Sequence, residues 1–188
     1  MSGKIVFVTG GARSGKSCFA EAYAARTGRR VAYIATAQCY DEEMRLRVAQ
    51  HQARRPVSWD TYEAPTAAEQ VITAAAAEHE TILFDCLTLY ASNLLCTFTE
   101  AQLADTGWAV AQVQAAGERL FAAAQASGRT VIFVSNEVGQ GIVPMNQLAR
   151  VYRDAQGLLN QRFAAAADEA YLTVSGIAID LKRLAVPY

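Results

Sequence analysis

The sequence predicts an α/β fold in which a mostly parallel β-sheet has helices on both faces and a C-terminal antiparallel hairpin. Three observations lead to this prediction. Apolar runs of strand length alternate with longer helix-forming runs, the pattern of parallel strands joined by crossover helices. Hydrophobic residues make up 52% of the 188 residues, enough to bury both faces of a sheet. No repeat, linker or break in composition divides the chain, so we expect one domain over residues 1–188.

Seven runs rich in β-branched, aliphatic or aromatic residues account for the strands. In chain order they are Lys4–Thr9, Arg30–Ala35, Ser58–Tyr62, Thr81–Asp85, Thr130–Ser135, Glu169–Ser175 and Ile177–Leu181. Ser175 and Gly176 separate the last two runs, and a Ser-Gly pair favours a tight turn between antiparallel strands.

Helix-forming runs fill the intervals between the strands. They are Ser17–Thr27, Asp41–Arg54, Ala67–His79, Cys86–Cys96, Glu100–Ser127 and Met145–Ala167. Several are rich in alanine, which has the highest helix propensity and permits close packing on a sheet. Arg55 precedes Pro56, and the residue before a proline disfavours helical geometry, so the second helix should end there.

Charge and cysteine content narrow the class of protein. The formal net charge of −1 argues against general binding to nucleic acid or to a membrane surface. No apolar run approaches the roughly 18–20 residues of a membrane span, and we expect no secretory leader before the first strand. The four cysteines are scattered without a C-x-x-C spacing, which is typical of reduced, mostly buried thiols rather than of a zinc site or a disulfide framework. We therefore expect a cytoplasmic protein.

Residues 10–17 form the most informative segment. The segment matches the pattern G-x-x-x-x-G-K-[ST] and lies directly after an apolar strand and before a helix. Its residues are Gly10, Gly11, Ala12, Arg13, Ser14, Gly15, Lys16 and Ser17. In this pattern the glycines let backbone N–H groups surround phosphate oxygens, and the lysine reaches the β- and γ-phosphates. The serine hydroxyl binds Mg²⁺, and the helix directs its positive end at the anion. The segment predicts a nucleotide site; the alternative is a glycine-rich structural turn.

Polar residues also follow three other strands, at Ala35-Thr36-Ala37-Gln38, at Asp85 and at Ser135-Asn136-Glu137. Because the carboxyl ends of parallel strands meet at one edge of a sheet, we expect these segments to join the phosphate loop in one site. Asp85 has the Walker B position, whose carboxylate holds Mg²⁺ directly or through water. The alternative for Asp85 is an N-cap of the next helix. Glu137 is either a base or metal-shell carboxylate, or a solvated acid.

The helix expected over Asp41–Arg54 carries a histidine among arginines. Arg47, His51 and Arg54 fall on one side of this helix. One interpretation is a solvated basic face; the other is an imidazole beside bound phosphates, with arginines that neutralise them. A pKa of about 6.5 leaves a histidine mostly neutral at cytosolic pH, so it can act as a nucleophile. The other histidine, His79, is expected on a surface turn.

Further blocks of sequence follow the same order as in one family of enzymes. The first of these blocks are Thr9–Ser17, Tyr33–Ala37, Arg47–His51, Arg55–Pro56 and Trp59–Glu63. The most specific is residues 135–144, Ser-Asn-Glu-Val-Gly-Gln-Gly-Ile-Val-Pro. The match runs nearly end to end, from residue 4 to about residue 181. In these blocks the chain resembles the bifunctional adenosylcobinamide kinase / adenosylcobinamide-phosphate guanylyltransferase family of cobalamin biosynthesis.

The resemblance implies two activities on one P-loop NTPase scaffold of the RecA-like kind. The first is phosphoryl transfer from ATP or GTP to a hydroxyl of adenosylcobinamide. The second is GMP transfer from GTP to adenosylcobinamide phosphate, with release of pyrophosphate. It also implies a homo-oligomer, trimeric in this family. The phosphate-loop pattern predicts Mg²⁺ as a cofactor, and the net charge predicts no nucleic-acid partner.

The resemblance also assigns roles to residues. His51 accepts the guanylyl group, and Lys16 offsets charge in phosphoryl transfer. Nucleotide contacts map onto Gly10–Ser17, Ala35, Thr36, Ala37, Gln52, Ala53, Arg54, Arg55, Glu63 and Asp85, with Ser17 and Asp85 as metal ligands. Relatives can have glutamate at position 85, so the aspartate leaves open whether the metal contact is direct. Two other functions stay open: a P-loop small-molecule kinase without nucleotidyl transfer, and a nucleotide-gated binding module without chemistry.

Overall fold

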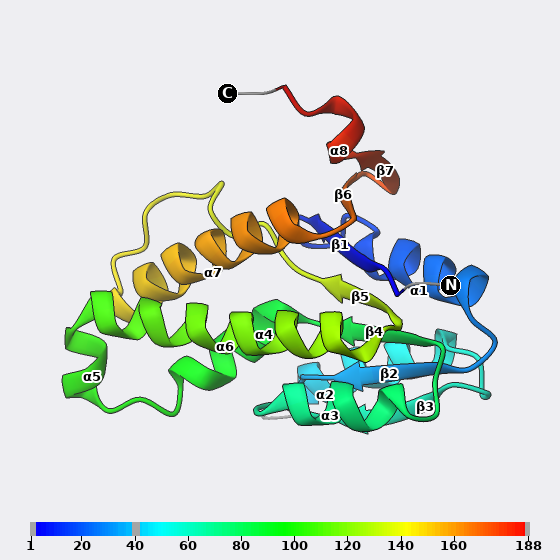
Figure 1. Cartoon of the computed structure of the whole chain (residues 1–188). Helices are drawn as coiled ribbons and strands as arrows, with labels where there is room; N and C mark the ends of the chain where they lie inside the picture. The colour runs from blue at the N-terminus through cyan, green and yellow to red at the C-terminus, as the bar shows by residue number, and fades with distance from the viewer. Residues whose placement is uncertain (1–2, 39–41, 187–188) are drawn as a thin grey trace.

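The computed structural model describes residues 3–38 and 42–186, apart from the side chains of Glu43, Met44, Arg47, Gln50, His51 and Arg54 (Figure 1). A sheet in the order β3-β2-β4-β5-β1-β6-β7 runs through this part of the chain. Every neighbouring pair is parallel except β6 and β7, so the predicted parallel sheet with a C-terminal antiparallel hairpin is confirmed. The strands are β1 (Ile5–Gly10), β2 (Val31–Ala35), β3 (Asp60–Glu63), β4 (Thr81–Asp85), β5 (Thr130–Val134), β6 (Glu169–Val174) and β7 (Ile177–Asp180).

Helices cover both faces of the sheet, as predicted. The helices α3, α4, α6 and α7 pack over one face, and α1 packs over the other (Figure 1). The helices are α1 (Lys16–Thr27), α2 (Glu42–Arg54), α3 (Ala68–Ala76), α4 (Leu87–Leu95), α5 (Glu100–Ala104), α6 (Thr106–Ser127), α7 (Gln147–Ala166) and α8 (Leu181–Leu184). None of the described helices combines the length and apolar character that a bilayer span requires.

Alternate residues of the central strands enter two separate cores. On β1, Phe7 joins the core beneath α3, α6 and α7, whereas Val6 and Val8 join the core beneath α1. Because both faces are buried, these strands are apolar throughout rather than alternately apolar and polar. In the larger core, α6 approaches α7 closely at Gly117, where a Cβ atom would lie 2.2 Å from Cδ1 of Leu159. Any larger residue at this position would therefore require the Leu159 side chain to move.

Several predicted elements end a few residues from the expected positions, and in two of them a side-chain cap sets the end. The helix expected over Glu100–Ser127 is two helices, because the Asp105 carboxylate accepts a hydrogen bond from the Trp108 N–H at 2.9 Å and caps α6. The strand expected over Ile177–Leu181 ends at Asp180, whose side chain caps α8 by accepting from the Arg183 N–H. The predicted tight turn between β6 and β7 is present, with positive φ at both Ser175 (51°) and Gly176 (82°).

The expectation that His79 lies on a surface turn is wrong. Its side chain is 1% exposed, with Nδ1 at 3.0 Å from the Ala75 carbonyl oxygen and Nε2 at 2.7 Å from Asp60 Oδ2. The ring also contacts the edge of Tyr62. His79 therefore links the end of α3 to the outer strand β3, and its buried imidazole has a structural role.

The expectation of mostly buried thiols is also wrong for the described cysteines. Cys86 is buried, but Cys18 and Cys96 are exposed. Cys18 lies in the first turns of α1, and Cys96 is the C-cap of α4, so neither enters the core. Cys39 lies outside the described residues.

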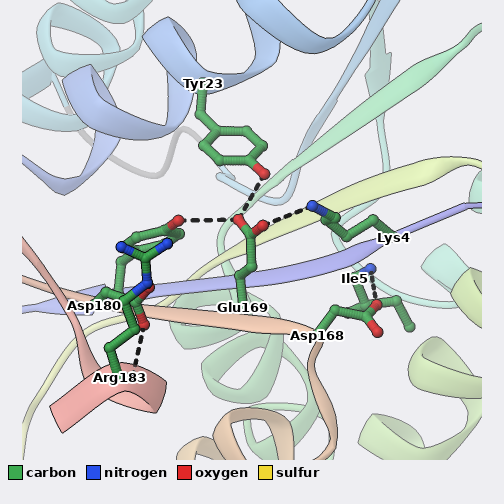
Figure 2. Close-up of polar contacts among 8 residues, drawn as sticks. Lys4, Ile5, Tyr23, Asp168, Glu169, Asp180 and Arg183 are labelled. Atoms are coloured by element: carbon green, nitrogen blue, oxygen red, sulfur yellow. Dashed lines mark hydrogen bonds and ion pairs between the residues drawn. The ribbon is translucent and has the colours of Figure 1, made fainter.

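The amino edge of the sheet is held by the carboxylate of Glu169 at the start of β6 (Figure 2). This carboxylate accepts hydrogen bonds from Lys4 Nζ at 2.6 Å, the Tyr23 hydroxyl at 2.6 Å and the Tyr171 hydroxyl at 3.0 Å. Burial opposes ionisation of Glu169, but these donors outweigh it and hold the pKa of Glu169 below its usual value. One carboxylate thus joins β1, α1 and β6 on the edge opposite the phosphate loop.

Candidate functional site

A cavity of about 550 Å³ lies at the carboxyl edge of the sheet, between the phosphate loop and the ends of β2, β4 and β5. The residues that line it are Ala12, Arg13, Ser14, Gly15, Lys16, Ser17, Cys18, Tyr33, Ala37, Val48, Asp85, Cys86, Leu89 and Asn136. The expected convergence of strand-end segments on the phosphate loop is therefore found for the segments that contain Ala37, Asp85 and Asn136. Most of the predicted G-x-x-x-x-G-K-[ST] segment faces this cavity.

The phosphate loop has the backbone geometry that its pattern predicts. Gly15 has φ 97°, a left-handed conformation that favours glycine, and α1 begins at the next residue, Lys16. The Lys16 ammonium donates to the Gly11 carbonyl oxygen at 3.2 Å. The N-terminus of α1 presents N–H groups and a positive partial charge towards the cavity, which favours a bound anion.

The turn between β6 and β7 supports the phosphate loop from behind. Ser14 Oγ and Thr173 Oγ1 are 2.8 Å apart, and the Gly176 N–H donates to the Ser14 carbonyl oxygen at 2.9 Å. A Cβ atom on Gly15 would lie 3.0 Å from the Cα of Gly176, so the two segments touch backbone to backbone. The C-terminal hairpin therefore fixes the position of the loop that would hold the phosphates.

Lys16 is a partly buried cation. Burial lowers its pKa, and the nearby Asp85 carboxylate offsets this only in part. The phosphates of a triphosphate bound in the cavity would place negative charge beside the Lys16 ammonium and stabilise its charged form. The site is therefore electrostatically suited to a polyanion.

Asp85 is oriented by Tyr33 rather than by a helix end. The Tyr33 hydroxyl donates to Asp85 Oδ2 at 2.9 Å, and burial raises the pKa of Tyr33, which keeps this hydroxyl protonated. The Arg55 guanidinium lies over the Tyr33 ring, 3.6 Å from its centroid, and also donates to Thr61 Oγ1 at 3.2 Å. The alternative role of Asp85 as an N-cap is not found, because the N-cap of α4 is Cys86.

Ser17 and Asp85 fit a magnesium ion. Both line the cavity and offer hard oxygen donors, a hydroxyl and a carboxylate. Among the described residues, no group of three or more histidine, cysteine, aspartate or glutamate side chains could hold a metal ion. Mg²⁺ usually has one or two protein carboxylates and completes its shell with substrate phosphates and waters.

Thr36 joins the ends of β2 and β4 and is completely buried. Its hydroxyl donates to the Cys86 carbonyl oxygen at 2.9 Å and accepts from the Cys86 N–H at 2.8 Å. Asn93 donates to the Thr36 carbonyl oxygen at 2.8 Å. Burial, together with the charge of Asp85, raises the pKa of the Cys86 thiol to about 11. These contacts keep the floor of the cavity rigid and its thiol protonated.

Glu137 belongs to a polar network behind the phosphate loop. Its Oε1 accepts from the Thr9 hydroxyl at 2.7 Å and from Asn160 Nδ2 at 3.1 Å. The Glu137 N–H donates to the Gly10 carbonyl oxygen at 3.1 Å. The carboxylate thus connects the end of β1 to α7, and the structure gives it a bracing contact that sequence reasoning did not predict.

Several predicted binding residues lie near the cavity without lining it. Gly10 and Gly11 begin the phosphate loop, Ala35 and Thr36 lie at the carboxyl end of the strand β2, and Arg55 packs on the cavity residue Tyr33. The others are Gln52 and Ala53, which are exposed on α2, and Glu63, which is exposed at the end of the outer strand β3. A nucleotide-binding role for these residues stays a prediction. The side chains of His51 and Arg54 lie outside the described part of the structure.

Sequence reasoning missed five residues that line the cavity: Cys18, Tyr33, Val48, Cys86 and Leu89. Only Tyr33 carried a signal that could have been used. It is the one residue with a hydroxyl in the apolar strand β2, and its side chain points to the same face as that of Ala35, the last residue of the strand. The others take part because α1, α2 and α4 come together at this edge, which a linear pattern does not reveal.

Comparison with known proteins gives a consistent result. Residues 6–181 match the family model described as cobinamide kinase / cobinamide phosphate guanyltransferase. The bifunctional adenosylcobalamin biosynthesis protein CobU of Salmonella typhimurium is 43% identical over 182 residues, which cover 95% of this chain and 99% of the relative. CobP of Pseudomonas aeruginosa, with the same descriptive name, is 42% identical over 93% of this chain and 95% of its own length.

A solved structure shares the fold. The KaiC-like protein of Pyrococcus horikoshii OT3 aligns with a TM-score of 0.50 at 11% sequence identity, over 91% of this chain and 71% of that chain. At this identity the likeness concerns the fold alone. Together with the sheet order and the phosphate loop after β1, it confirms the predicted RecA-like P-loop NTPase fold.

Proposed function

Because this chain belongs to the cobinamide kinase / cobinamide phosphate guanyltransferase family, we propose that it phosphorylates adenosylcobinamide and then converts the phosphate into adenosylcobinamide-GDP. The observation that carries the proposal is the cavity that unites the phosphate loop, Lys16 and Asp85 in a chain that matches the family over nearly its whole length. Both reactions require a nucleoside triphosphate held by its phosphates, and this cavity has the donors and the charge for it.

The kinase step is an in-line displacement at the γ-phosphorus of ATP or GTP. The hydroxyl oxygen of adenosylcobinamide forms a bond to the γ-phosphorus, the bond from that phosphorus to the β,γ-bridging oxygen breaks, and the nucleoside diphosphate leaves. The hydroxyl proton is lost to water. Lys16 and the N–H groups at the start of α1 offset the charge on the phosphates, and Ser17 and Asp85 would hold a magnesium ion, which would supply further positive charge.

The guanylyl step takes place at the α-phosphorus of GTP. We propose that the unprotonated ring nitrogen of His51 attacks this phosphorus, the bond to the α,β-bridging oxygen breaks, and pyrophosphate leaves. The N–H proton of the ring passes to water, which leaves a GMP phosphoramidate on the histidine. A phosphate oxygen of adenosylcobinamide phosphate then attacks the same phosphorus, the N–P bond breaks, and the histidine takes up a proton again.

The position of α2 supports this role for His51. Val48, on α2, lines the cavity, and positions i and i+3 lie on the same face of a helix. The backbone of His51 is thus one turn beyond a residue that borders the triphosphate cavity. Arg55, just beyond the end of α2, packs on Tyr33 and so holds this end of the helix beside Asp85.

The remaining features of the proposal concern the setting of the enzyme. We propose that residues 1–188 form a single domain, that Mg²⁺ accompanies the nucleotide, and that the enzyme works in the cytoplasm as a homotrimer. Its partners would be adenosylcobinamide and adenosylcobinamide phosphate, with no role for nucleic acid. Sedimentation or light scattering would give the subunit number, and a monomer would contradict that part of the proposal.

Product analysis with two nucleotides tests the proposed function. With MgATP and adenosylcobinamide alone, we expect adenosylcobinamide phosphate and ADP. With MgGTP, we expect adenosylcobinamide-GDP and pyrophosphate as well. Formation of the phosphate without the GDP product would indicate a kinase that lacks nucleotidyl transfer. Nucleotide binding without substrate-dependent release of ADP or GDP would indicate a binding module.

A further inference from the structure

Asn136 leaves the sheet between the two parts of the phosphate site. Its strand, β5, lies between β4, which ends in Asp85, and β1, which leads into the phosphate loop. The pairing with β1 continues past the end of β5, because the Ser135 N–H donates to the Val8 carbonyl oxygen at 2.9 Å and the Glu137 N–H donates to that of Gly10. In this topology Asn136, the second residue after β5, lies at the sheet edge between the Walker B carboxylate and the phosphate loop.

The backbone of Asn136 is held from three sides. Its N–H donates to Thr88 Oγ1 at 2.9 Å, and its carbonyl oxygen accepts from Asn160 Nδ2 at 2.9 Å. The following N–H, that of Glu137, is bonded to Gly10 as described above. The preceding side chain, Ser135, points to the opposite face and donates to Asn160 Oδ1 at 2.6 Å. The Asn136 side chain therefore starts from a fixed backbone on the face of the sheet that carries the phosphate loop.

Asn136 is among the residues that line the cavity with Lys16 and Asp85, and its side-chain Oδ1 has no hydrogen-bond partner among the described residues. This oxygen is buried from solvent. A buried amide oxygen without a donor is unfavourable, so its presence in a rigid site calls for an explanation. The nearby Glu137 does not share this property, because its Oε1 already accepts from Thr9 and Asn160.

The chemistry of Oδ1 restricts what can bind it. An amide oxygen accepts hydrogen bonds only, and the ionised phosphate oxygens of a nucleoside triphosphate are acceptors too. The phosphate groups of a bound nucleotide therefore leave Oδ1 unsatisfied. The hydroxyl group that attacks the γ-phosphorus is a donor, and it must occupy the space beside the terminal phosphate.

We propose that Asn136 is a catalytic residue of the kinase reaction, whose Oδ1 accepts the hydrogen bond of the attacking hydroxyl; this inference rests on the proposed function. The asparagine stays neutral. It orients the hydroxyl so that an oxygen lone pair faces the γ-phosphorus while the bond to the β,γ-bridging oxygen breaks, and the hydroxyl proton then passes to water. The guanylyl step involves no hydroxyl nucleophile, so formation of the protein–GMP intermediate does not use Asn136.

Asn136→Ala tests the proposal because the two reactions of the same protein serve as internal controls. We expect kcat for phosphorylation of adenosylcobinamide to fall by ~10²-fold, the usual effect of losing one positioning contact on a reacting group. The Kd for MgATP and the rate of GMP attachment from MgGTP should stay within about twofold. Asn136→Asp keeps an acceptor oxygen of the same reach and should recover at least ~10-fold of the lost rate.

Asn146→Ala is the matched control. Asn146 is on the same connection between β5 and α7, but its Oδ1 accepts from the Ala149 N–H at 3.1 Å and caps α7. We expect this variant to lose thermal stability and to keep its kinase rate. If Asn136→Ala behaves like Asn146→Ala, with lower stability and an unchanged rate, Asn136 is structural and the proposal is wrong.

Two further results would overturn the inference. Equal losses in kinase rate and in GMP attachment would mean that Oδ1 meets a metal-bound water or another part shared by both reactions. A rate for Asn136→Asp as low as that for Asn136→Ala would exclude the acceptor role. If the wild-type protein phosphorylates adenosylcobinamide but never acquires GMP, the guanylyl part of the proposed function fails. The inference is then tested by whether Asn136→Ala lowers the kinase rate while its Kd for MgATP stays within about twofold of the wild-type value.

Discussion

Replacing Tyr33 by phenylalanine should weaken magnesium binding without dismantling the site. The substitution removes the hydroxyl that donates to Asp85 Oδ2 at 2.9 Å but keeps the ring on which Arg55 packs at 3.6 Å. A hydrogen bond to a charged acceptor is worth ~1.5–3 kcal/mol. Asp85 is only partly buried, so water can replace part of it, and we expect stability to fall by about 1 kcal/mol. Loss of a hydrogen-bond partner of a metal ligand lowers metal affinity by ~10–100-fold. Because Asp85 is partly solvated, we expect the lower end of this range, a loss of about 10-fold in Mg²⁺ affinity.

The assay is a magnesium titration of the kinase reaction at saturating nucleotide, accompanied by chemical denaturation. We expect the Mg²⁺ concentration for half-maximal rate to rise about 10-fold in Tyr33→Phe, which corresponds to ~1.4 kcal/mol. Tyr23→Phe is the control, because Tyr23 donates to Glu169 at 2.6 Å on the opposite edge of the sheet. It should lose comparable stability and keep its magnesium requirement. An unchanged magnesium requirement in Tyr33→Phe would refute the assignment of Asp85 as a metal ligand.

Three further predictions concern charge, accessibility and stability. Because burial lowers the pKa of Lys16, triphosphate affinity should be highest near neutral pH and should decrease as the pH rises through this lowered value, below the 10.5 of an ordinary lysine. Calorimetric Kd values that stay constant from neutral pH to pH 10.5 would contradict this. Among the described cysteines, Cys18 lines the cavity and Cys96 does not, so MgGTP should slow alkylation of Cys18 and leave that of Cys96 unchanged. The buried Cys86 thiol, whose pKa is raised to about 11, should not be alkylated with or without MgGTP. Equal protection of Cys18 and Cys96 would argue against a nucleotide in this cavity. His79→Ala should lower the free energy of unfolding by ~2–3 kcal/mol through its lost buried contacts and leave GMP attachment intact, as denaturation and mass measurements would show.

The elements that sequence analysis predicted correctly have strong local signals. The apolar strands and the phosphate loop are specified by runs of neighbouring residues, and Ser175 with Gly176 specifies the C-terminal turn. The break at Asp105 had a local signal as well, an aspartate followed two residues later by Gly107, but the helix-forming residues on either side outweighed it. Local signals therefore predict which elements form better than where they end.

The contacts that organise the site are not local, and sequence analysis did not find them. Tyr33 reaches Asp85 across 52 residues of sequence, and His79 reaches Asp60 across 19. These pairs depend on strand register and on which side of a helix faces the sheet. A register error of one residue would place the side chains of a strand on the opposite face of the sheet, so neither pair could be predicted. Asn136 shows the same limit, since the sequence placed it at the correct edge but could not show that its amide oxygen has no donor.

The central claim is that one triphosphate cavity serves two reactions and that His51 carries the GMP group between them. The most direct measurement is the intact mass of the protein after incubation with MgGTP alone, followed by peptide mapping. The account predicts the added mass of one GMP, labile in acid and stable in base, on the peptide that contains His51, and no added mass in His51→Ala. A wild-type protein that gains no mass and releases no pyrophosphate, or a GMP group on another residue, would contradict it.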